Sequence, residues 1–315
     1  METFNHHLPV LLEEVLSFLP EKKDSVVVDM TLGRAGHASH ILAKSDGKVT
    51  FYGFDKDAQA IAYSKKKLHL YADKADLHLI QAPYSTAIDH LVEDGIKGAD
   101  FILFDIGVSS PQFDDPKRGF SYRYDAFLDM RMNQNDKLTA YEIVNTYSEK
   151  DLIRVFRDLG QCQNYYPVVK KIVATRVKKP IETTLELVDI IKSSLPSYQL
   201  NKIGHPAKQF FLGLRYEVNK EIDELKTGLS RAISFLNPGG RIVIITFNSE
   251  EDKIVKDLFL KVSKTAPTNK YLPPIEKEVD YLLLTKKPLK ASSAELAANN
   301  RAKSAILRAL ERKMP

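Results

Sequence analysis

The fold is decided by the stretch VVVDMTLGRAGH, which runs from Val26 to His37. Its first residues are β-branched and end at an acid, Asp29, which is typical of a short buried strand. A turn with Gly33 and Gly36 follows and leads into a helix-like segment. Because glycine lets the backbone approach a ligand closely, we interpret this strand, turn and helix start as a binding edge.

The same alternation continues along the chain. Strand-like segments cover residues 49–55, 77–80 and 101–105, and helix-like segments cover 58–68 and 86–93. Strands that alternate with helices predict a parallel sheet with helices on both faces, which is an α/β fold.

Helix signals alone occupy the next part of the chain. Thr139, Ser148 and Thr183 each precede an acid by three residues, as in capping boxes, and Gly160 is placed to end the second helix. Strand signals return at 241–247 and 281–285. We therefore expect a discontinuous sheet domain (residues 1–112 and 205–290), a helical insertion (113–204) and a basic tail (291–315). Ligands bind beyond the carboxyl ends of parallel strands, so the insertion is expected to grip the substrate.

Composition narrows the class of protein. The chain has 315 residues, is 43% hydrophobic and has one cysteine, Cys162, so it resembles an ordinary globular protein without disulfides or a cysteine-rich metal site. No signal peptide or membrane span is recognisable. We expect a cytoplasmic protein that needs no metal and has no membrane partner.

Positive charge is unevenly distributed. The formal net charge is +5, and from Lys286 onward eight bases accompany two acids. A second cluster contains no acid and comprises Lys170, Lys171, Arg176, Lys178 and Lys179. Both patches favour contact with nucleic acid phosphates, although the tail is equally well explained as a solvated helix end.

The binding edge favours one class of cofactor. Asp55 ends the second strand, where a carboxylate accepts hydrogen bonds from both hydroxyls of an adenosine ribose. Gly33-x-x-Gly36 is not the G-x-G-x-x-G of dinucleotide sites, and a Walker A lysine is missing. Tyr84 and Asp105 follow the third and fourth strands, which suits contacts to the adenine and to the reacting end. A core tyrosine and a helix-capping aspartate are the structural alternatives.

A family resemblance emerges at DIGVSSPQFDDPKRGFS, which begins at Asp105, and at LDMRM, which begins at Leu128. Together with HLPVLLEE from His7 and KPIETT from Lys179, these motifs closely resemble the MraW/RsmH-type methyltransferases. Shorter matches extend the resemblance along nearly the whole chain. The family methylates the exocyclic N4 of a cytidine in small-subunit ribosomal RNA.

The resemblance implies a Rossmann-like methyltransferase sheet with an inserted all-helical domain and S-adenosylmethionine as cofactor. With Gly33 of the turn added, the implied cofactor-binding residues are Ala35, Gly36, His37, Asp55, Tyr84, Asp105 and Gln112. The implied partner is 16S ribosomal RNA, at its decoding region, either as naked RNA or in the assembled small subunit. A homodimer is left open.

The chain departs from the family at several positions. Ala35 stands where the family has glycine, and cofactor binding without strain then requires a negative φ. Asn248 replaces a histidine and cannot exchange a proton at neutral pH, so acid-base chemistry there is excluded. Lys208 and Gln209 replace Thr-Arg, which affects the RNA contacts more than the cofactor site.

The reaction sets requirements of its own. A cytosine amino group is a poor nucleophile, so acceptors must hold its N–H bonds and orient the nitrogen. We assign this role to Asp105 and to the loop around Ser109. We further expect Arg118, Phe120, His205 and Lys208 to contact RNA, with Arg118 holding phosphate and Phe120 stacking a flipped base. The structural alternative buries Phe120 and pairs Arg118 within the insertion.

Two other functions stay open on the sequence. The first is a non-catalytic ribosome-assembly factor that retains the fold, because of the changes at Ala35, Gln209 and Asn248. The second is a nicotinamide-dependent oxidoreductase, which the missing G-x-G-x-x-G disfavours.

Overall fold

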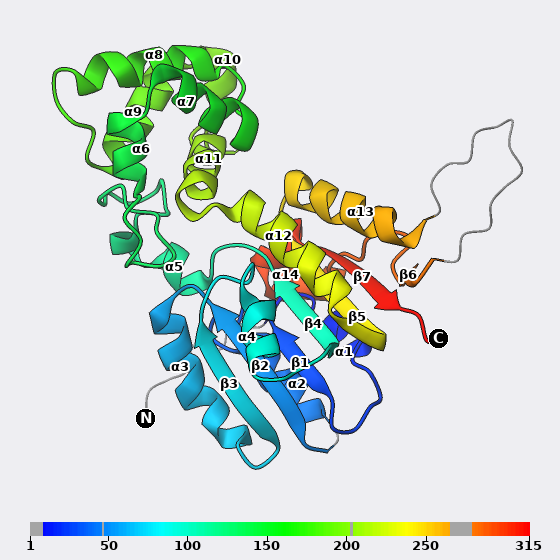
Figure 1. The fold of residues 1–315 in the computed structure, drawn as a ribbon. Helices are drawn as coiled ribbons and strands as arrows, with labels where there is room; N and C mark the ends of the chain where they lie inside the picture. The colour runs from blue at the N-terminus through cyan, green and yellow to red at the C-terminus, as the bar shows by residue number, and fades with distance from the viewer. Residues whose placement is uncertain (1–8, 46, 202–203, 265–278) are drawn as a thin grey trace, which may run out of the picture. The chain divides into compact units, whose positions relative to one another are not determined.

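The computed structural model describes residues 9–45, 47–201, 204–264 and 279–315 (Figure 1). The chain forms two compact units: unit 1 is Met1–Gly107 with Glu224–Pro315, and unit 2 is Val108–Asp223. Unit 2 extends further than the predicted insertion. Its C-terminal extension contains α11 (Lys208–Asn219), whose Phe210 and Leu214 are buried in the core of unit 2.

Unit 1 contains a seven-stranded sheet in the described residues. Its strands are β1 (Val26–Asp29), β2 (Val49–Asp55), β3 (Ala75–Gln81), β4 (Ala99–Asp105), β5 (Leu236–Thr246), β6 (Tyr281–Leu283) and β7 (Ile306–Arg312). They are ordered β3-β2-β1-β4-β5-β7-β6. Strands β1 to β5 are parallel to one another, whereas β7 is antiparallel to its two neighbours, β5 and β6. The predicted α/β fold is confirmed.

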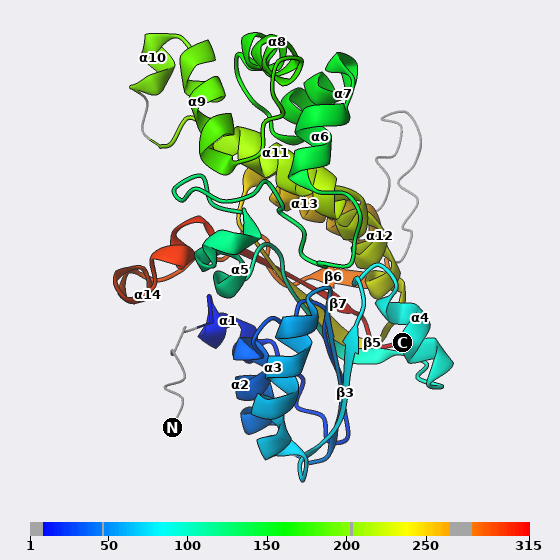
Figure 2. The ribbon, with the colours of Figure 1, turned by 90° about the vertical axis from the view of Figure 1, so that its left-hand side faces the viewer.

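Helices cover both faces of this sheet (Figures 1 and 2). They are α1 (Leu12–Ser17), α2 (Gly36–Lys44), α3 (Ala58–Leu68), α4 (Ala87–Glu93), α12 (Glu221–Ser234, which begins in unit 2), α13 (Ser249–Ser263) and α14 (Ser293–Ala298), with 3₁₀ turns at His69–Tyr71 and Asn300–Ser304. Successive strand residues point to opposite faces, so Val27 packs with α1 to α3 and Val28 with α4, α12 and α13. Burial on both faces explains why the central strands are almost entirely apolar.

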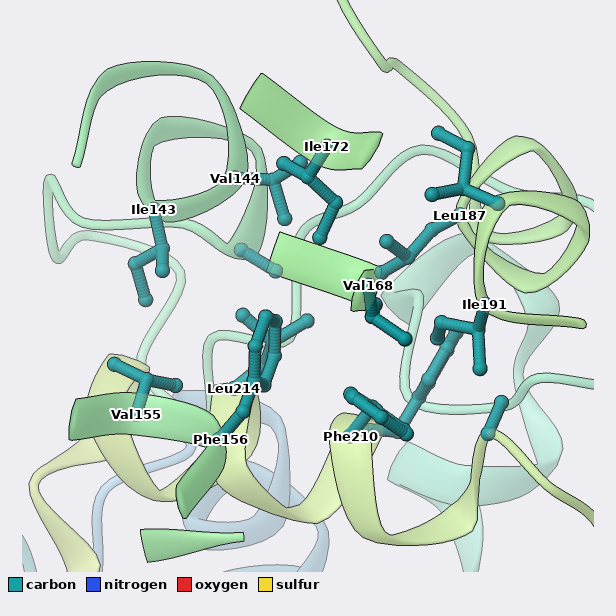
Figure 3. Close-up of a cluster of buried hydrophobic side chains, with 14 of the residues drawn as sticks. Ile143, Val144, Val155, Phe156, Val168, Ile172, Leu187, Ile191, Phe210 and Leu214 are labelled. Atoms are coloured by element: carbon teal, nitrogen blue, oxygen red, sulfur yellow. The ribbon is translucent and has the colours of Figure 1, made fainter. Parts of the chain in front are cut away.

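Unit 2 is helical in its described part, as the sequence predicts. Its helices are α5 (Ser110–Asp114), α6 (Ala140–Thr146), α7 (Glu149–Ile153), α8 (Tyr165–Arg176), α9 (Thr184–Ser194), α10 (Ser197–Leu200) and α11, with a 3₁₀ turn at Pro116–Arg118 and a π-helical turn at Arg154–Leu159. Capping boxes form at Thr139 and Thr183, and Gly160 ends the π-helical turn. Aliphatic and aromatic side chains from α6, α8, α9 and α11 fill its core (Figure 3). None of the described helices has both the length and the apolar character to cross a bilayer.

The tail differs from the predicted basic arm. Residues 306–312 form β7, which pairs with β5 from Arg241 to Thr246. Arg308 donates two hydrogen bonds, of 2.6 and 2.9 Å, to Asp252 of α13, and Arg312 donates to the carbonyl oxygen of Leu236. These bonds join β7 to α13 and to β5, which removes Arg308 and Arg312 from the set expected to contact phosphate.

The second basic cluster is also bonded within its unit. Lys170 pairs with Glu149 at 3.0 Å, and Lys179 pairs with Glu186 at 2.7 Å. Arg176 donates to two carbonyl oxygens at the end of α6, where a cation offsets the helix dipole. These pairings weaken the sequence argument that the cluster is an RNA surface.

Candidate functional site

Unit 1 has a topological switch point between β1 and β4. On one side of this point the sheet continues from β1 to β2 and β3, and on the other side it continues from β4 to β5. Ligands of open α/β sheets bind at the carboxyl ends of the strands at such a point. Asp29 and Asp105 end these two strands, and Asp55 ends β2. The structure therefore brings together the three carboxylates that the sequence predicts at this edge. In the described residues, no group of three acidic, histidine or cysteine side chains is arranged to hold a metal ion.

The glycine turn is tied to Asp55. The backbone N–H of Gly33 donates to Oδ2 of Asp55 at 2.8 Å, and the N–H of Asp57 donates to Oδ1 at 2.8 Å. Burial raises the pKa of Asp55 to about 6, against the lowering effect of these two N–H groups. Each oxygen keeps a lone pair, so the carboxylate can accept further bonds from a ligand.

Ala35 lies in a left-handed conformation, with φ of +53°. The negative φ that unstrained binding requires is therefore absent, because Ala35 caps α2 just where the chain reverses from the turn into the helix. Its N–H donates to the carbonyl oxygen of Leu32 at 2.8 Å, and its carbonyl oxygen accepts from Nζ of Lys67 at 3.0 Å. These two bonds hold the strained turn, and Gly36 begins the helix immediately after it.

Asp105 carries a buried oxygen without a partner. Among the described residues, no group donates to its Oδ1, although that atom is shielded from solvent. Burial raises the pKa of Asp105 to about 7, and it raises the pKa of Asp29 to about 7 as well. An unsatisfied buried acceptor is costly in a folded protein, so it is a marker of a ligand-binding position.

His37 lies beside Asp105. Its Nδ1 is 3.7 Å from Oδ2 of Asp105, and its Nε2 is 2.9 Å from the carbonyl oxygen of Val10. The ring is only 6% exposed. His37 thus links the N-terminal segment to the end of β4, whereas the sequence resemblance implies only that it binds the cofactor.

Tyr84 follows β3, as predicted. Its ring meets Phe104 of β4 edge-on, with centroids 5.6 Å apart. A Cβ atom at Gly228 of α12 would lie 2.6 Å from the Tyr84 ring, so glycine is needed there to admit the ring. Tyr84 is therefore held between the sheet and α12, and its contact with adenine stays a prediction.

Ser109 and Gln112 belong to unit 2. Oε1 of Gln112 accepts a hydrogen bond of 3.0 Å from the backbone N–H of Ser109, which closes the first turn of α5. Gln112 is 4% exposed. This bond gives Gln112 a structural role, and the predicted roles of both residues toward cofactor and substrate stay predictions.

Arg118 and Phe120 favour the structural alternative over RNA contact. Phe120 is 5% exposed and belongs to the core of unit 2. Nη2 of Arg118 donates to the carbonyl oxygens of Arg131 at 3.0 Å and Met132 at 2.9 Å. A buried ring and a guanidinium bonded to main chain are poorly placed to stack a base or hold phosphate.

His205 and Lys208 lie nearer the surface of unit 2. The His205 ring stacks on Tyr122, with centroids 4.4 Å apart, and its Nδ1 accepts from the N–H of Ala207 at 3.3 Å. Burial lowers the pKa of His205, and the cations Lys192 and Arg123 lower it further. Lys208 is exposed at the start of α11. Contact of these two residues with RNA stays a prediction.

Asn248 has a clear structural function. Its Oδ1 accepts hydrogen bonds from the N–H groups of Glu250 and Glu251, at 3.1 and 3.0 Å, as the N-cap of α13. Asparagine is among the best N-cap residues. The departure from histidine at this position therefore preserves the helix start.

Two residues that were not predicted from the sequence also shape the site. Oγ1 of Thr31 accepts the backbone N–H of Asp105 at 2.6 Å, and Oγ of Ser64 donates to the carbonyl oxygen of Gly33 at 2.9 Å. Thr31 stands inside the decisive stretch, so its position two residues after a strand-ending acid was the available signal. Ser64 gave none, because it lies on α3 in a run of polar residues.

Comparisons with known proteins identify the family. Residues 4–313 match the model of the MraW methylase family. Ribosomal RNA small subunit methyltransferase H of Streptococcus equi subsp. equi (strain 4047) is 45% identical over 305 residues, which is 96% of each chain.

Solved structures give weaker similarities. An rRNA methylase from Streptococcus thermophilus has a TM-score of 0.41 at 11% identity and covers 96% of this chain and 94% of its own. TrmN from Thermus thermophilus has a TM-score of 0.41 at 11% identity, over 96% of this chain and 48% of its own. The assignment therefore rests on sequence: with the family match spanning nearly its whole length, this chain belongs to the MraW methylase family.

Proposed function

We propose that this protein transfers a methyl group from S-adenosylmethionine to the exocyclic N4 amino group of a cytidine in the decoding region of 16S ribosomal RNA. Membership of the MraW methylase family and the relative named ribosomal RNA small subunit methyltransferase H support this activity. The observation that carries the proposal is the convergence of Asp29, Asp55 and Asp105 with the Gly33 turn at the switch point.

The residues of this edge fit the cofactor. Asp55 keeps lone pairs for the two ribose hydroxyls, and Gly33 donates to Asp55, which fixes the carboxylate in place. A Cβ atom at Gly33 would meet no atom closer than 3.9 Å, so the turn leaves open space beside it. When bound, S-adenosylmethionine supplies an electrophilic methyl group. Tyr84 is proposed to contact its adenine.

Asp105 is proposed to hold the reacting amino group. Its unpartnered Oδ1 is an acceptor for one N–H bond, and Thr31 fixes the backbone that carries it. An acceptor in place before the reaction orients the nitrogen without a cost of reorganisation. Ser109 and the carbonyl oxygens of residues 107–110 are proposed as acceptors for the second N–H bond, and Gln112 is proposed to contact the cofactor.

One observation favours a second candidate. The strained Ala35 replaces a glycine of the family's turn, which is a change expected in a non-catalytic ribosome-assembly factor that retains the fold. An oxidoreductase is not favoured, because Thr31 stands where a dinucleotide site has the first glycine of G-x-G-x-x-G.

Methyl transfer separates these candidates. Small subunits from a strain that lacks this gene are incubated with tritiated S-adenosylmethionine and the purified protein, and naked 16S RNA serves as a second substrate. Mass spectrometry of decoding-region fragments then locates the added methyl group. We expect one modified cytidine. Failure to label either substrate, with cofactor binding intact by calorimetry, would contradict the proposed methyl transfer and favour the assembly factor.

Asp105→Ala tests the site. Loss of a preorganised acceptor lowers kcat by on the order of 100-fold at saturating cofactor and substrate. Asp73→Ala, an exposed acid in the same unit, is the control and should retain wild-type turnover. Near-normal turnover of Asp105→Ala would contradict its assignment.

A further inference from the structure

Phe247 stands at the edge of the sheet where Asp105 lies. It directly follows β5, and Ile245 of β5 is in register with Asp105 of β4. Ile245 and Phe247 pack into one cluster of apolar side chains, on the face of the sheet that α1 to α3 cover. Asp105 turns to this face as well, since its Oδ2 lies 3.7 Å from Nδ1 of His37 on α2. Phe247 and Asp105 therefore share one edge and one face of the sheet, at the ends of adjacent strands.

Gly107 leaves one side of the Phe247 ring open. A Cβ atom at Gly107 would lie 3.6 Å from Cδ2 of Phe247, which is ordinary van der Waals contact. With glycine at this position, no side chain stands there against the ring. Gly107 also has φ of +130°, which favours glycine over other residues. Phe247 is partly exposed, so the structure presents an accessible aromatic ring close to Asp105.

The backbone of Phe247 is fixed by the helix that follows it. Its N–H donates to Oε2 of Glu251 at 3.0 Å, and Glu251 is only 2% exposed. The N–H of Glu251 in turn donates to Oδ1 of Asn248, the N-cap of α13. A ring carried on a fixed backbone can bind a ligand at little cost in conformational entropy.

The proposed reaction calls for such a ring. An enzyme that acts on the edge of a base must draw the base out of its stack, and an aromatic side chain then replaces the lost stacking. Phe120, the residue predicted from the sequence for this role, is buried in the core of unit 2. Tyr84 packs on the other face of the sheet, against Phe104. Phe247 meets the requirement because it is partly exposed and lies on the face of Asp105.

We propose that Phe247 stacks on the target cytosine and so places its amino group against Oδ1 of Asp105. This inference rests on the proposed methyl transfer to a cytidine. Oδ1 of Asp105 is a buried acceptor without a partner among the described residues. A hydrogen bond to Oδ1 holds the amino end of the base, and the ring of Phe247 sets the plane of the base. Together the two contacts orient the nitrogen for in-line attack on the methyl group.

Three variants separate the ring from its packing. Phe247→Leu keeps an apolar side chain but has no ring, whereas Phe247→Tyr keeps the ring. Phe18→Leu is the matched control: Phe18 packs against the same cluster, but its carbonyl oxygen accepts from Arg241, which pairs with Phe101 near the start of β4. With small subunits as substrate, the kcat/KM of Phe247→Leu should fall on the order of tenfold to 100-fold. The kcat/KM of the other two variants should stay within about threefold of wild type.

Cofactor affinity distinguishes a contact with the base from a contact with the cofactor. Titration calorimetry should give the same dissociation constant for S-adenosylmethionine in Phe247→Leu and in wild type, within about twofold. A wild-type kcat/KM in Phe247→Leu, an equal loss in Phe18→Leu, or a loss confined to cofactor affinity would each overturn the inference.

A binding measurement keeps this test apart from the proposed methyl transfer. The protein is deuterated except at its phenylalanines and mixed with cytidine and S-adenosylhomocysteine, and the phenylalanine ring protons are saturated in a nuclear magnetic resonance experiment. We expect the saturation to reach the base protons of cytidine in wild type and in Phe18→Leu, and to be lost in Phe247→Leu. This pattern would support the stacking even if no methyl transfer occurs. Transfer that persists in Phe247→Leu, or that is absent in wild type, would refute the stacking even if the enzyme methylates its RNA.

Discussion

The backbone N–H of Leu11 donates a 2.7 Å hydrogen bond to the carboxylate of Glu295, 284 residues away in sequence. Leu11 has φ of +53° and is fully buried, so this bond holds a strained residue in place. The N-terminal segment and the tail helix therefore form one structural element beside His37.

Glu295→Ala should lower the free energy of unfolding by about 1–2 kcal/mol, because a partly buried N–H loses a charged acceptor. Glu295→Gln keeps an acceptor oxygen and should lose less than half as much. Urea unfolding of unit 1, followed by circular dichroism, measures both. Equal losses in the two variants would contradict the role of the hydrogen bond.

Ala35→Gly should stabilise the protein by about 0.5–1 kcal/mol. The left-handed conformation costs a non-glycine residue roughly 1–2 kcal/mol, and the extra freedom of glycine in the unfolded chain offsets about 0.4–1 kcal/mol of that. Ala38→Gly, in the interior of the same helix, is the matched control and should destabilise by about 1 kcal/mol. If both variants lose stability alike in urea unfolding, Ala35 is not strained.

Much of unit 1 could be predicted from sequence because the signals are local. The strands at 26–29 and 49–55 end as expected, at Asp29 and Asp55. In each case an apolar run followed by an acid indicates where the strand ends. The helix at 58–68 is likewise correct. Because strands that alternate with helices form a parallel sheet, their carboxyl ends lie at one edge. The acids that end these strands are therefore predicted to lie at that edge, although no contact between them can be predicted from the sequence.

The remainder depends on partners that are distant in sequence. The sequence around Arg308 and Arg312 predicts a solvated basic tail. In the structure these residues belong to β7 and bond to Asp252 and to the carbonyl group of Leu236, which are distant in sequence. The φ of Ala35 and the burial of Phe120 likewise follow from tertiary packing. Propensity and charge patterns contain no information on such pairings.

The pair of Arg308 and Asp252 should contribute measurably to stability. Their side chains are 12% and 18% exposed and share two hydrogen bonds, so a double-mutant cycle with Arg308→Gln and Asp252→Asn should give a coupling of about 1–2 kcal/mol. The more exposed pair of Lys170 and Glu149 should give less than about 0.5 kcal/mol. A coupling near zero for the first pair would restore Arg308 to the candidates for RNA contact.

Phe120 and Lys208 should separate stability from RNA binding. Phe120→Ala removes a buried ring from unit 2 and should cost about 3–5 kcal/mol. Lys208→Ala should change stability by less than about 0.5 kcal/mol, while RNA affinity falls and the slope of log affinity against log salt decreases by about one. Filter binding over a range of salt concentrations measures this slope. An unchanged slope would exclude a phosphate contact at Lys208.

Asp29 should make the stability of unit 1 depend on pH. Burial raises its pKa to about 7 in the folded protein from an ordinary value of 3.8, so the folded state binds the proton more tightly than the unfolded state. The resulting stabilisation is complete below pH 4 and is lost as pH rises through 7. Asp29→Asn retains an oxygen to accept the N–H of Thr31 but does not titrate. Its stability relative to wild type should therefore increase steadily between pH 4 and 7 in urea unfolding, with Asp73→Asn as the control for removing a charge. A constant difference across this range would mean that Asp29 is ionised as easily in the folded protein as in the unfolded chain.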